Sequence, residues 1–201
     1  MKLLEEKIKE NGVLINGEVL KVDSFLNHKI DVRLLNEMGR EFARLFAGLG
    51  INKILTVEAS WIGIACIVAQ HFDNAEVLFA KKNQTKNLDN VTYSANVTSF
   101  THGRDYMIRV SKKYLTSEDR VLIIDDFLAA GQAVFGLIDL CKQAQATVCG
   151  VGICIEKAFQ GGGAALRREG VNLHSLAIVD LKNDGELSFI DDADAAKILI
   201  K

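Results

Sequence analysis

Two patterns of apolar residues alternate along the chain. In 32–49 the apolar side chains recur every three or four positions with charged residues between them, which predicts an amphipathic helix. Short, nearly continuous apolar runs predict buried strands at 53–57, 76–80, 121–124 and 147–155. Further helices are predicted at 1–12, at 64–72, from Gln132 onward and at 164–169. Strands that alternate with helices imply an α/β fold, with a central, mainly parallel sheet and helices on both faces.

Three segments depart from this alternation. Residues 13–22 alternate around an Asn-Gly pair, which predicts a small two-stranded ribbon. Residues 23–28 have no clean period and fit either a surface loop or one wall of a ligand site. Between about 82 and 112, a polar stretch precedes two strand-like runs joined near His102-Gly103, which predicts an inserted, flexible antiparallel flap. The last strands are predicted at 174–179 and 186–190.

The segment from Val121 to Gly136 carries the clearest chemistry. Its apolar run predicts a strand buried on both faces, with Asp125 and Asp126 at the strand's end. A turn of small residues and a glycine then lead into a helix that begins at Gln132. Backbone N–H groups in such a turn can surround a phosphate, while the carboxylates accept sugar hydroxyls or stand beside a metal. The alternative is an ordinary strand-to-helix turn with acids near a helix N-terminus.

Other charged residues follow the remaining predicted strands. In a parallel sheet the carboxyl ends of the strands meet at one edge, so Glu58, Lys81, Asp125 and Lys157 are expected to converge there. Lys81 and its neighbour Lys82 suit the neutralisation of a pyrophosphate, or else form a solvated pair. Lys157 is either part of the site or a surface lysine.

Composition limits the choice of function. The 201 residues suit one domain over 1–201, and the 49% apolar and 25% charged content is that of an ordinary globular protein. A net charge of −2 gives no reason to expect nucleic acid or an anionic membrane as a partner. The opening segment mixes charges and no run is long enough to span a bilayer, so a cytoplasmic protein is expected. The four cysteines and four histidines lack metal-ligand spacing, so no protein-held metal is expected.

The segment Val121-Leu-Ile-Ile-Asp-Asp-Phe-Leu-Ala-Ala-Gly-Gln-Ala133 resembles the phosphoribosyl-diphosphate (PRPP) motif of the phosphoribosyltransferases, in the form found in bacterial xanthine phosphoribosyltransferases. Further similarity to that family, in matching order and spacing, lies at 20–28, 56–60, 79–81, 99–101 and 155–160. It extends over nearly the whole chain.

The resemblance implies a type I phosphoribosyltransferase fold, with a small hood formed by about 1–30 and the C-terminal part, and a homodimer. The implied reaction is transfer of the 5-phosphoribosyl group from PRPP to N9 of xanthine, which gives xanthosine 5′-monophosphate and pyrophosphate in purine salvage. Asp125 and Asp126 would act at the ribose, and Mg²⁺ would arrive with PRPP. The residues implied in PRPP binding are Ala129, Ala130, Gly131, Gln132, Ala133, Ser60 and Lys81, and those implied in purine binding are Leu20, Asn27 and Lys157.

Two positions, Trp61 and Ala130, depart from the family pattern, whereas Ala129 agrees with the xanthine enzymes. Trp61 replaces a glycine of the pyrophosphate loop, where an indole is expected to be strained, to block the phosphate or to swing away. Ala130 replaces an asparagine, and Ala129 stands where relatives that use hypoxanthine and guanine have an aspartate. Two alternatives stay open: a non-catalytic module that senses PRPP or purines, which Trp61 favours, and a phosphoribosyltransferase that prefers guanine or hypoxanthine.

Overall fold

The computed structural model describes residues 1–15, 19–82, 91–99, 104–182 and 186–195. Its centre is a six-stranded sheet in the order β10-β9-β8-β7-β3-β4. These strands are β3 (Lys53–Val57), β4 (Glu76–Ala80), β7 (Arg120–Leu128), β8 (Thr147–Lys157), β9 (Leu173–Leu181) and β10 (Leu187–Ile190). Neighbouring strands run parallel except β10, which pairs antiparallel with β9 at the edge. The predicted α/β fold with a mainly parallel sheet is confirmed.

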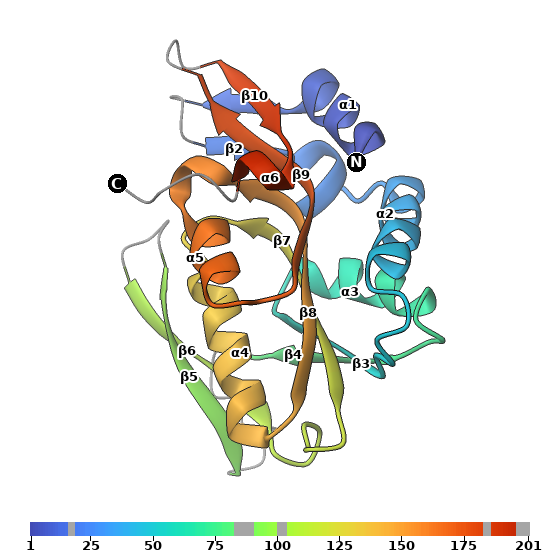
Figure 1. The fold of residues 1–201 in the computed structure, drawn as a ribbon, viewed down its shortest axis with the longest axis vertical. Helices are drawn as coiled ribbons and strands as arrows, with labels where there is room; N and C mark the ends of the chain where they lie inside the picture. Colours follow the sequence, from blue (N-terminus) through green and yellow to red (C-terminus); the bar gives the residue numbers. More distant parts are fainter. Residues whose placement is uncertain (16–18, 83–90, 100–103, 183–185, 196–201) are drawn as a thin grey trace.

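Helices cover both faces of this sheet (Figure 1). The helices are α1 (Lys2–Asn11), α2 (Val32–Leu45), α3 (Trp61–Gln70), α4 (Gln132–Ala144), α5 (Gly162–Arg168) and α6 (Asp192–Ala195). On one face Leu122 and Ile124 of β7 belong to a core shared with α2 and α3. On the other face Val121 and Ile123 belong to a core shared with α4. This two-sided burial is why β7 reads as an unbroken apolar run.

Two small antiparallel sheets are attached to this body. One consists of β1 (Val13–Ile15) and β2 (Val19–Lys21), and the Asn-Gly turn predicted between them lies outside the described residues. The other consists of β5 (Thr92–Ser99) and β6 (Arg104–Ser111) and is called the flap below. The flap packs on α4 in the second core, and backbone hydrogen bonds of 2.9 Å between Lys81 and Arg109 join it to the end of β4.

The structure corrects four details of the predicted elements. β7 continues to Leu128, so Asp125 and Asp126 lie within the strand and the turn is limited to 129–131. α3 begins at Trp61 rather than at Ile64. Gly162 and Gly163 belong to α5 instead of a loop, and Asp23–Asn27 forms a turn of π-helix. The polar stretch 83–90 and the tip of the flap lie outside the described residues.

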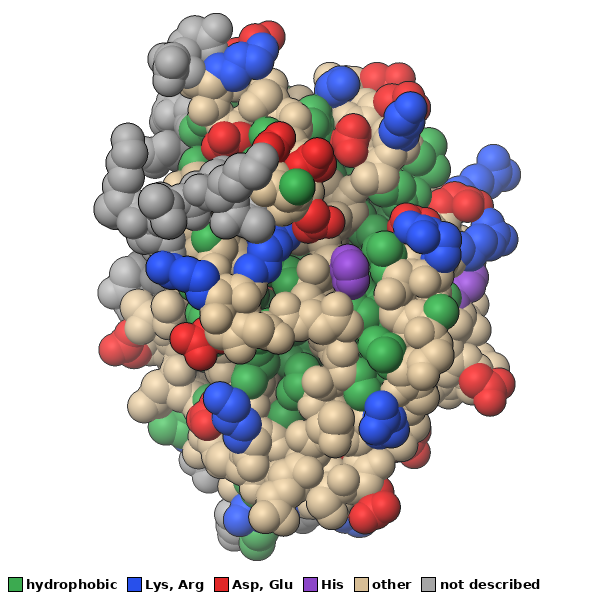
Figure 2. Space-filling view, in the orientation of Figure 1, with side chains coloured by type: hydrophobic (Ala, Val, Ile, Leu, Met, Phe, Trp, Pro, Cys, Tyr) green, Lys and Arg blue, Asp and Glu red, His purple; other side chains and the backbone are tan. Residues whose placement is uncertain are grey.

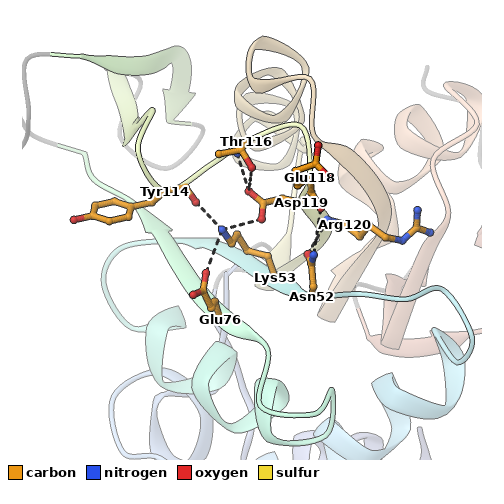
Figure 3. Close-up of polar contacts among 8 residues, drawn as sticks. All are labelled: Asn52, Lys53, Glu76, Tyr114, Thr116, Glu118, Asp119 and Arg120. Atoms are coloured by element: carbon orange, nitrogen blue, oxygen red, sulfur yellow. Dashed lines mark hydrogen bonds and ion pairs between the residues drawn. The ribbon is translucent and has the colours of Figure 1, made fainter.

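A buried charge cluster joins the amino ends of β3 and β7, at the edge of the sheet opposite to Asp125 (Figure 3). The ammonium of Lys53 lies 2.7 Å from the carbonyl oxygen of Tyr114, 2.9 Å from Asp119 Oδ1 and 3.3 Å from Glu76 Oε2. Asp119 in turn accepts a 2.7 Å hydrogen bond from the Thr116 amide. Lys53 is therefore a fixed structural cation and not a ligand-binding group.

On the face seen in Figure 2, acidic side chains gather in the upper middle, and basic and acidic side chains are interspersed elsewhere. This agrees with the small net charge of −2. Among the described residues, no helix has the length and apolar character needed to cross a membrane.

Candidate active site

A cavity of about 1100 Å³ opens at the carboxyl edge of the sheet. Its floor is the end of β7 and the turn that follows, and its walls come from five separate parts of the chain. The lining residues outside 125–134 are Val19, Leu20, Asn27, Ser60, Trp61, Lys82, Val97, Thr98, Asp105, Tyr106 and Lys157. The cavity brings together every candidate site residue named above except Lys81.

The turn between β7 and α4 forms one end of the cavity. Gly131 precedes the first residue of α4 with a φ of 83°, a conformation that favours glycine. Ala129, Ala130 and Ala133 line the cavity with side chains of one carbon, which leaves room for a ligand near the backbone. The free N–H groups and the dipole at the start of a long helix favour an anion here. The first turn of α4 contains no acidic residue that would compete.

The carboxylates of Asp125 and Asp126 are almost fully buried, at 2% and 3% exposure. Asp125 Oδ1 accepts a 2.9 Å hydrogen bond from the Asp126 amide, and Asp126 Oδ1 accepts a 2.6 Å bond from the Phe127 amide. Burial raises the pKa of both groups, and the charge of Asp126 raises that of Asp125 further. Two buried acceptors beside an anion site are suited to receive the hydroxyls of a sugar phosphate.

Another part of the cavity wall has an aromatic ring with polar groups around it. Lys157, at the end of β8, holds its ammonium 5.2 Å from the centre of the Phe127 ring. Burial lowers the pKa of Lys157, and the nearby charge of Asp126 opposes this effect. Asn27, from the π-helical turn, donates a 3.3 Å hydrogen bond to Asp126 Oδ2. Together with Leu20 of β2, these side chains offer apolar surface and hydrogen-bonding groups to a planar heterocycle.

Comparison with known proteins identifies the family. No protein-family model matches the chain. The xanthine phosphoribosyltransferase of Clostridioides difficile (strain 630) is 54% identical over 189 residues, which cover 94% of this chain and 100% of that protein. The xanthine phosphoribosyltransferase of Bifidobacterium longum (strain NCC 2705) is 56% identical over 191 residues, covering 94% and 99% of the two chains. The chain belongs to the xanthine phosphoribosyltransferase family.

Solved structures support the fold of this xanthine phosphoribosyltransferase family member. An adenine phosphoribosyltransferase from Thermoanaerobacter pseudethanolicus superposes with a TM-score of 0.71 at 21% identity, over 89% of this chain and 99% of that chain. The Giardia lamblia enzyme complexed with 9-deazaadenine gives a TM-score of 0.69 at 17% identity, over 90% and 98%. At this identity the likeness concerns the fold alone. The predicted type I phosphoribosyltransferase fold is confirmed.

Trp61 is the main departure from the family's motif, and its indole lines the cavity instead of swinging away from it. It is the first residue of α3, so the substitution does not force a left-handed backbone. Burial raises the pKa of Asp126, and interactions with the side chains of Asn27 and Trp61 oppose that rise. The indole is therefore close enough to Asp126 to influence its charge. Ser60, which precedes Trp61, also lines the cavity.

Lys82 holds the position in the cavity wall that the sequence suggested for Lys81. Its ammonium lies 5.1 Å from the centre of the Trp61 ring and 5.3 Å from that of the Tyr106 ring. Its amide donates a 2.6 Å hydrogen bond to Glu58 Oε1, and its positive charge opposes the rise in the pKa of Asp125. Lys81 is the residue paired with the flap. Of these two adjacent lysines, only Lys82 lines the cavity.

Several cavity residues were missed from the sequence, among them Phe127, Tyr106 and Asp105. Phe127 appeared as part of a turn, and its role as a wall depends on β7 extending further than its apolar run. Tyr106 and Asp105 come from the flap, whose position depends on pairing with Lys81 and packing on α4. The alternation along β6 was available as a signal for which flap residues share a face, but it did not reveal what that face covers.

The donor set near the turn was tested against the Mg²⁺ that the family implies. Within the described residues, no group of three or more His, Cys, Asp or Glu side chains can hold a metal ion. Mg²⁺ commonly uses only one or two carboxylates and completes its octahedron with water and substrate phosphates. The buried pair Asp125 and Asp126 therefore fits a Mg²⁺ ion that arrives with a polyphosphate and does not form a metal cage of its own.

Proposed function

We propose that the protein transfers the 5-phosphoribosyl group of PRPP to N9 of xanthine and releases xanthosine 5′-monophosphate and pyrophosphate. The observation that carries this proposal is that three groups of residues line one cavity. These are the turn of Ala129 to Ala133, the carboxylates of Asp125 and Asp126, and a wall with Leu20, Asn27 and Lys157.

The phosphate and the ribose would bind to β7 and its turn. The backbone of Ala129, Ala130, Gly131, Gln132 and Ala133 would hold the 5-phosphate, with Ser60 and Lys82 on the pyrophosphate side. The carboxylates of Asp125 and Asp126 would accept the ribose hydroxyls and stabilise positive charge on the sugar as the bond to pyrophosphate breaks. Lys81, which does not line the cavity, would act on PRPP only indirectly, through the flap.

The base would bind at the wall with Leu20, Asn27 and Lys157. As the bond from C1′ to pyrophosphate oxygen breaks, N9 of xanthine forms the new bond to C1′ and its proton leaves. Ala129 supplies no carboxylate for this proton, so its release rests on the acidity of xanthine or on a water molecule. The ammonium of Lys157, held over Phe127, would stabilise the purine anion. Holding base and sugar in line supplies much of the remaining rate acceleration.

Three further features belong to the same proposal. Mg²⁺ held by the PRPP phosphates and by Asp125 or Asp126 would neutralise the charge of the leaving pyrophosphate. The active form would be a homodimer, and the protein would work in cytoplasmic purine salvage. The domain would comprise a hood from about 1–30 and the C-terminal part, and a flap within 82–112.

The test is an assay with PRPP, Mg²⁺ and one of xanthine, guanine or hypoxanthine, in which nucleotide formation is followed by chromatography. We expect xanthosine 5′-monophosphate with the highest kcat/KM. A higher kcat/KM for guanine or hypoxanthine would contradict the base assignment and leave the phosphoribosyl transfer in place.

A second candidate function is a non-catalytic sensor of PRPP or purines. The presence of the Trp61 indole in the cavity, beside Asp126, is the observation that favours it. Calorimetry with PRPP and Mg²⁺ separates the two. Retained binding without nucleotide from any of the three bases would support the sensor and exclude the transferase.

A further inference from the structure

The N-terminus of α5 packs directly against the turn that follows β7. The Gly162 amide donates a 3.0 Å hydrogen bond to the carbonyl oxygen of Ala129. In a trans peptide unit the C=O and the following N–H point in opposite directions. Fixing the Ala129 carbonyl on Gly162 therefore directs the amide of Ala130 to the opposite side of the turn. Ala130 lines the cavity, whereas Gly162 does not.

No side chain fits at Gly162. A Cβ atom there would lie 2.2 Å from the Ala129 carbonyl oxygen, 2.6 Å from the Gly131 nitrogen and 2.7 Å from the Ala130 carbonyl carbon. All three atoms are backbone atoms of the turn, so no change of rotamer can relieve the overlap. Gly131 itself adopts a positive φ of 83°, which limits how the turn can rearrange. A side chain at 162 must displace the turn as a whole.

A short connection ties this contact to the base wall. β8 ends at Lys157, a 3-10 turn spans Ala158–Gln160, and Gly161 with a φ of 77° leads into α5. The position of α5 is held by the buried Glu156, whose two carboxylate oxygens accept hydrogen bonds of 2.6 and 2.9 Å from Arg167. The Glu156–Arg167 pair thus fixes α5 and with it Gly162, and the turn packs against Gly162.

We infer that Gly162 is a positioning residue that sets the backbone of the turn at Ala129 to Gly131 and thereby the affinity for the 5-phosphate. The inference rests on the proposed function, because it assumes that this turn binds the phosphate of PRPP. Gly162 acts through the turn and does not touch the ligand. A displacement of about 1 Å in such a site can reduce the rate by about 10²-fold.

The test compares Gly162→Ala with the unmodified protein in calorimetric titrations with ribose 5-phosphate. We expect the variant to bind ribose 5-phosphate at least about tenfold more weakly and to raise KM for PRPP in proportion, with little change in the dissociation constant for xanthine alone. Equal affinity for ribose 5-phosphate in a folded Gly162→Ala protein would overturn the inference. Absence of ribose 5-phosphate binding by the unmodified protein would instead overturn the proposed function.

Gly170→Ala is the matched control. Gly170 lies beyond the end of α5 with a φ of 75°, and a Cβ there would lie within 4 Å of no atom, so the change strains the backbone without pressing on the turn. We expect it to lower the melting temperature and to leave ribose 5-phosphate affinity within about twofold.

A second measurement uses the unmodified protein and decides the question if Gly162→Ala does not fold. Hydrogen exchange of the Gly162 amide is followed with and without ribose 5-phosphate. We expect the ligand to slow this exchange, because the amide is bonded to the turn. Unchanged exchange at Gly162 under saturating ligand would overturn the inference.

Discussion

The ammonium of Lys82 lies 5.1 Å from the centre of the Trp61 ring, at the point where the family's motif has a glycine. Tyr106 of the flap approaches the same ammonium from 5.3 Å, so the cation is shared between an aromatic side chain of the sheet body and one of the flap. The two rings therefore hold an ammonium that would otherwise be available to a pyrophosphate. If pyrophosphate binds here as proposed, Trp61 would compete with it for Lys82.

Replacing Trp61 by glycine tests this competition. A cation–π contact is worth about 1 kcal/mol, so Trp61→Gly should lower the dissociation constant for PRPP about fivefold. Calorimetry measures the affinity, and an assay of nucleotide formation measures turnover. Trp61→Phe keeps a ring at the position and serves as the control, with an affinity close to that of the unmodified protein. Equal PRPP affinity and turnover in Trp61→Gly would show that the cavity accommodates the indole without cost.

The same residue supplies a direct readout of ligand binding. The chain contains 1 tryptophan, so its intrinsic fluorescence reports Trp61 alone. If PRPP draws Lys82 away from the ring, adding PRPP with Mg²⁺ should change the emission intensity or wavelength in a saturable way. Titration with xanthine alone is the control and should have a smaller effect, because xanthine carries no phosphate that would attract Lys82. Emission that PRPP leaves unchanged would contradict the contact.

Stability and function should respond in opposite directions to Asp125→Asn. Burial raises the pKa of Asp125 above the unfolded value of about 3.9. As pH rises from the unfolded pKa through the folded one, the unfolded chain loses its proton first, so the unfolding free energy falls. An amide has no such penalty. We expect Asp125→Asn to raise the melting temperature at pH 7 by about 2–4 °C, equivalent to about 1 kcal/mol.

This stabilisation should shrink towards zero as pH falls to about 3, where Asp125 is protonated in both the folded and the unfolded protein. Thermal unfolding followed by circular dichroism at pH 3 to 8 measures the stabilisation. In the same variant kcat/KM should fall by on the order of 10²-fold. Asp119→Asn is the control at the other edge of the sheet: it weakens the pairing with Lys53 and should lower the melting temperature. A lower melting temperature for Asp125→Asn at pH 7 would contradict the prediction.

The strands of the central sheet were predictable because a buried strand consists of a run of apolar side chains. β3 and β4 begin and end at the predicted residues, since their runs of apolar side chains coincide with the paired backbone. β7 did not follow this rule at its end. The polar side chains of Asp125 and Asp126 interrupt the apolar run, yet the backbone continues to pair with β8 as far as Leu128.

The meeting of most candidate residues in one cavity was predictable from the motif, while their long-range contacts were not. The turn at Ala129 to Ala133 lines the same cavity as Leu20, Asn27 and Lys157. That Lys82 and not Lys81 lines the cavity depends on the pairing of Lys81 with Arg109 in the flap, 28 positions further along the chain. The approach of Gly162 to Ala129 likewise depends on where β8 places α5. No local sequence pattern predicts these contacts, because each of the two segments in contact can form its secondary structure without the other.

Asn27 is expected to link the base to the ribose. Its side-chain amide donates to Asp126 Oδ2 over 3.3 Å, so it reaches from the π-helical turn to the carboxylate pair. Asn27→Ala removes this bond along with a polar contact to the purine, and we expect KM for xanthine to rise about tenfold and PRPP affinity to change by less. Lys21→Ala, on the neighbouring strand and in an exposed pair with Asp23, is the control and should leave both unchanged. A rise in KM for PRPP without a rise in KM for xanthine would contradict the assignment of Asn27 to the base.

Lys53 should be important for stability and unimportant for activity. Its side chain and that of Asp119 are only 8% and 10% exposed, and they lie at the edge of the sheet opposite to the cavity. Lys53→Met leaves Asp119 buried without its main cation, which typically costs about 3 kcal/mol of unfolding free energy. Urea unfolding should show this loss, while kcat/KM of the folded variant stays within about twofold. Glu76→Gln is the matched control, because Glu76 contacts the same ammonium with 82% of its side chain exposed and should cost less than about 0.5 kcal/mol. A loss below about 1 kcal/mol for Lys53→Met would mean that water or the Thr116 amide satisfies Asp119 without the lysine.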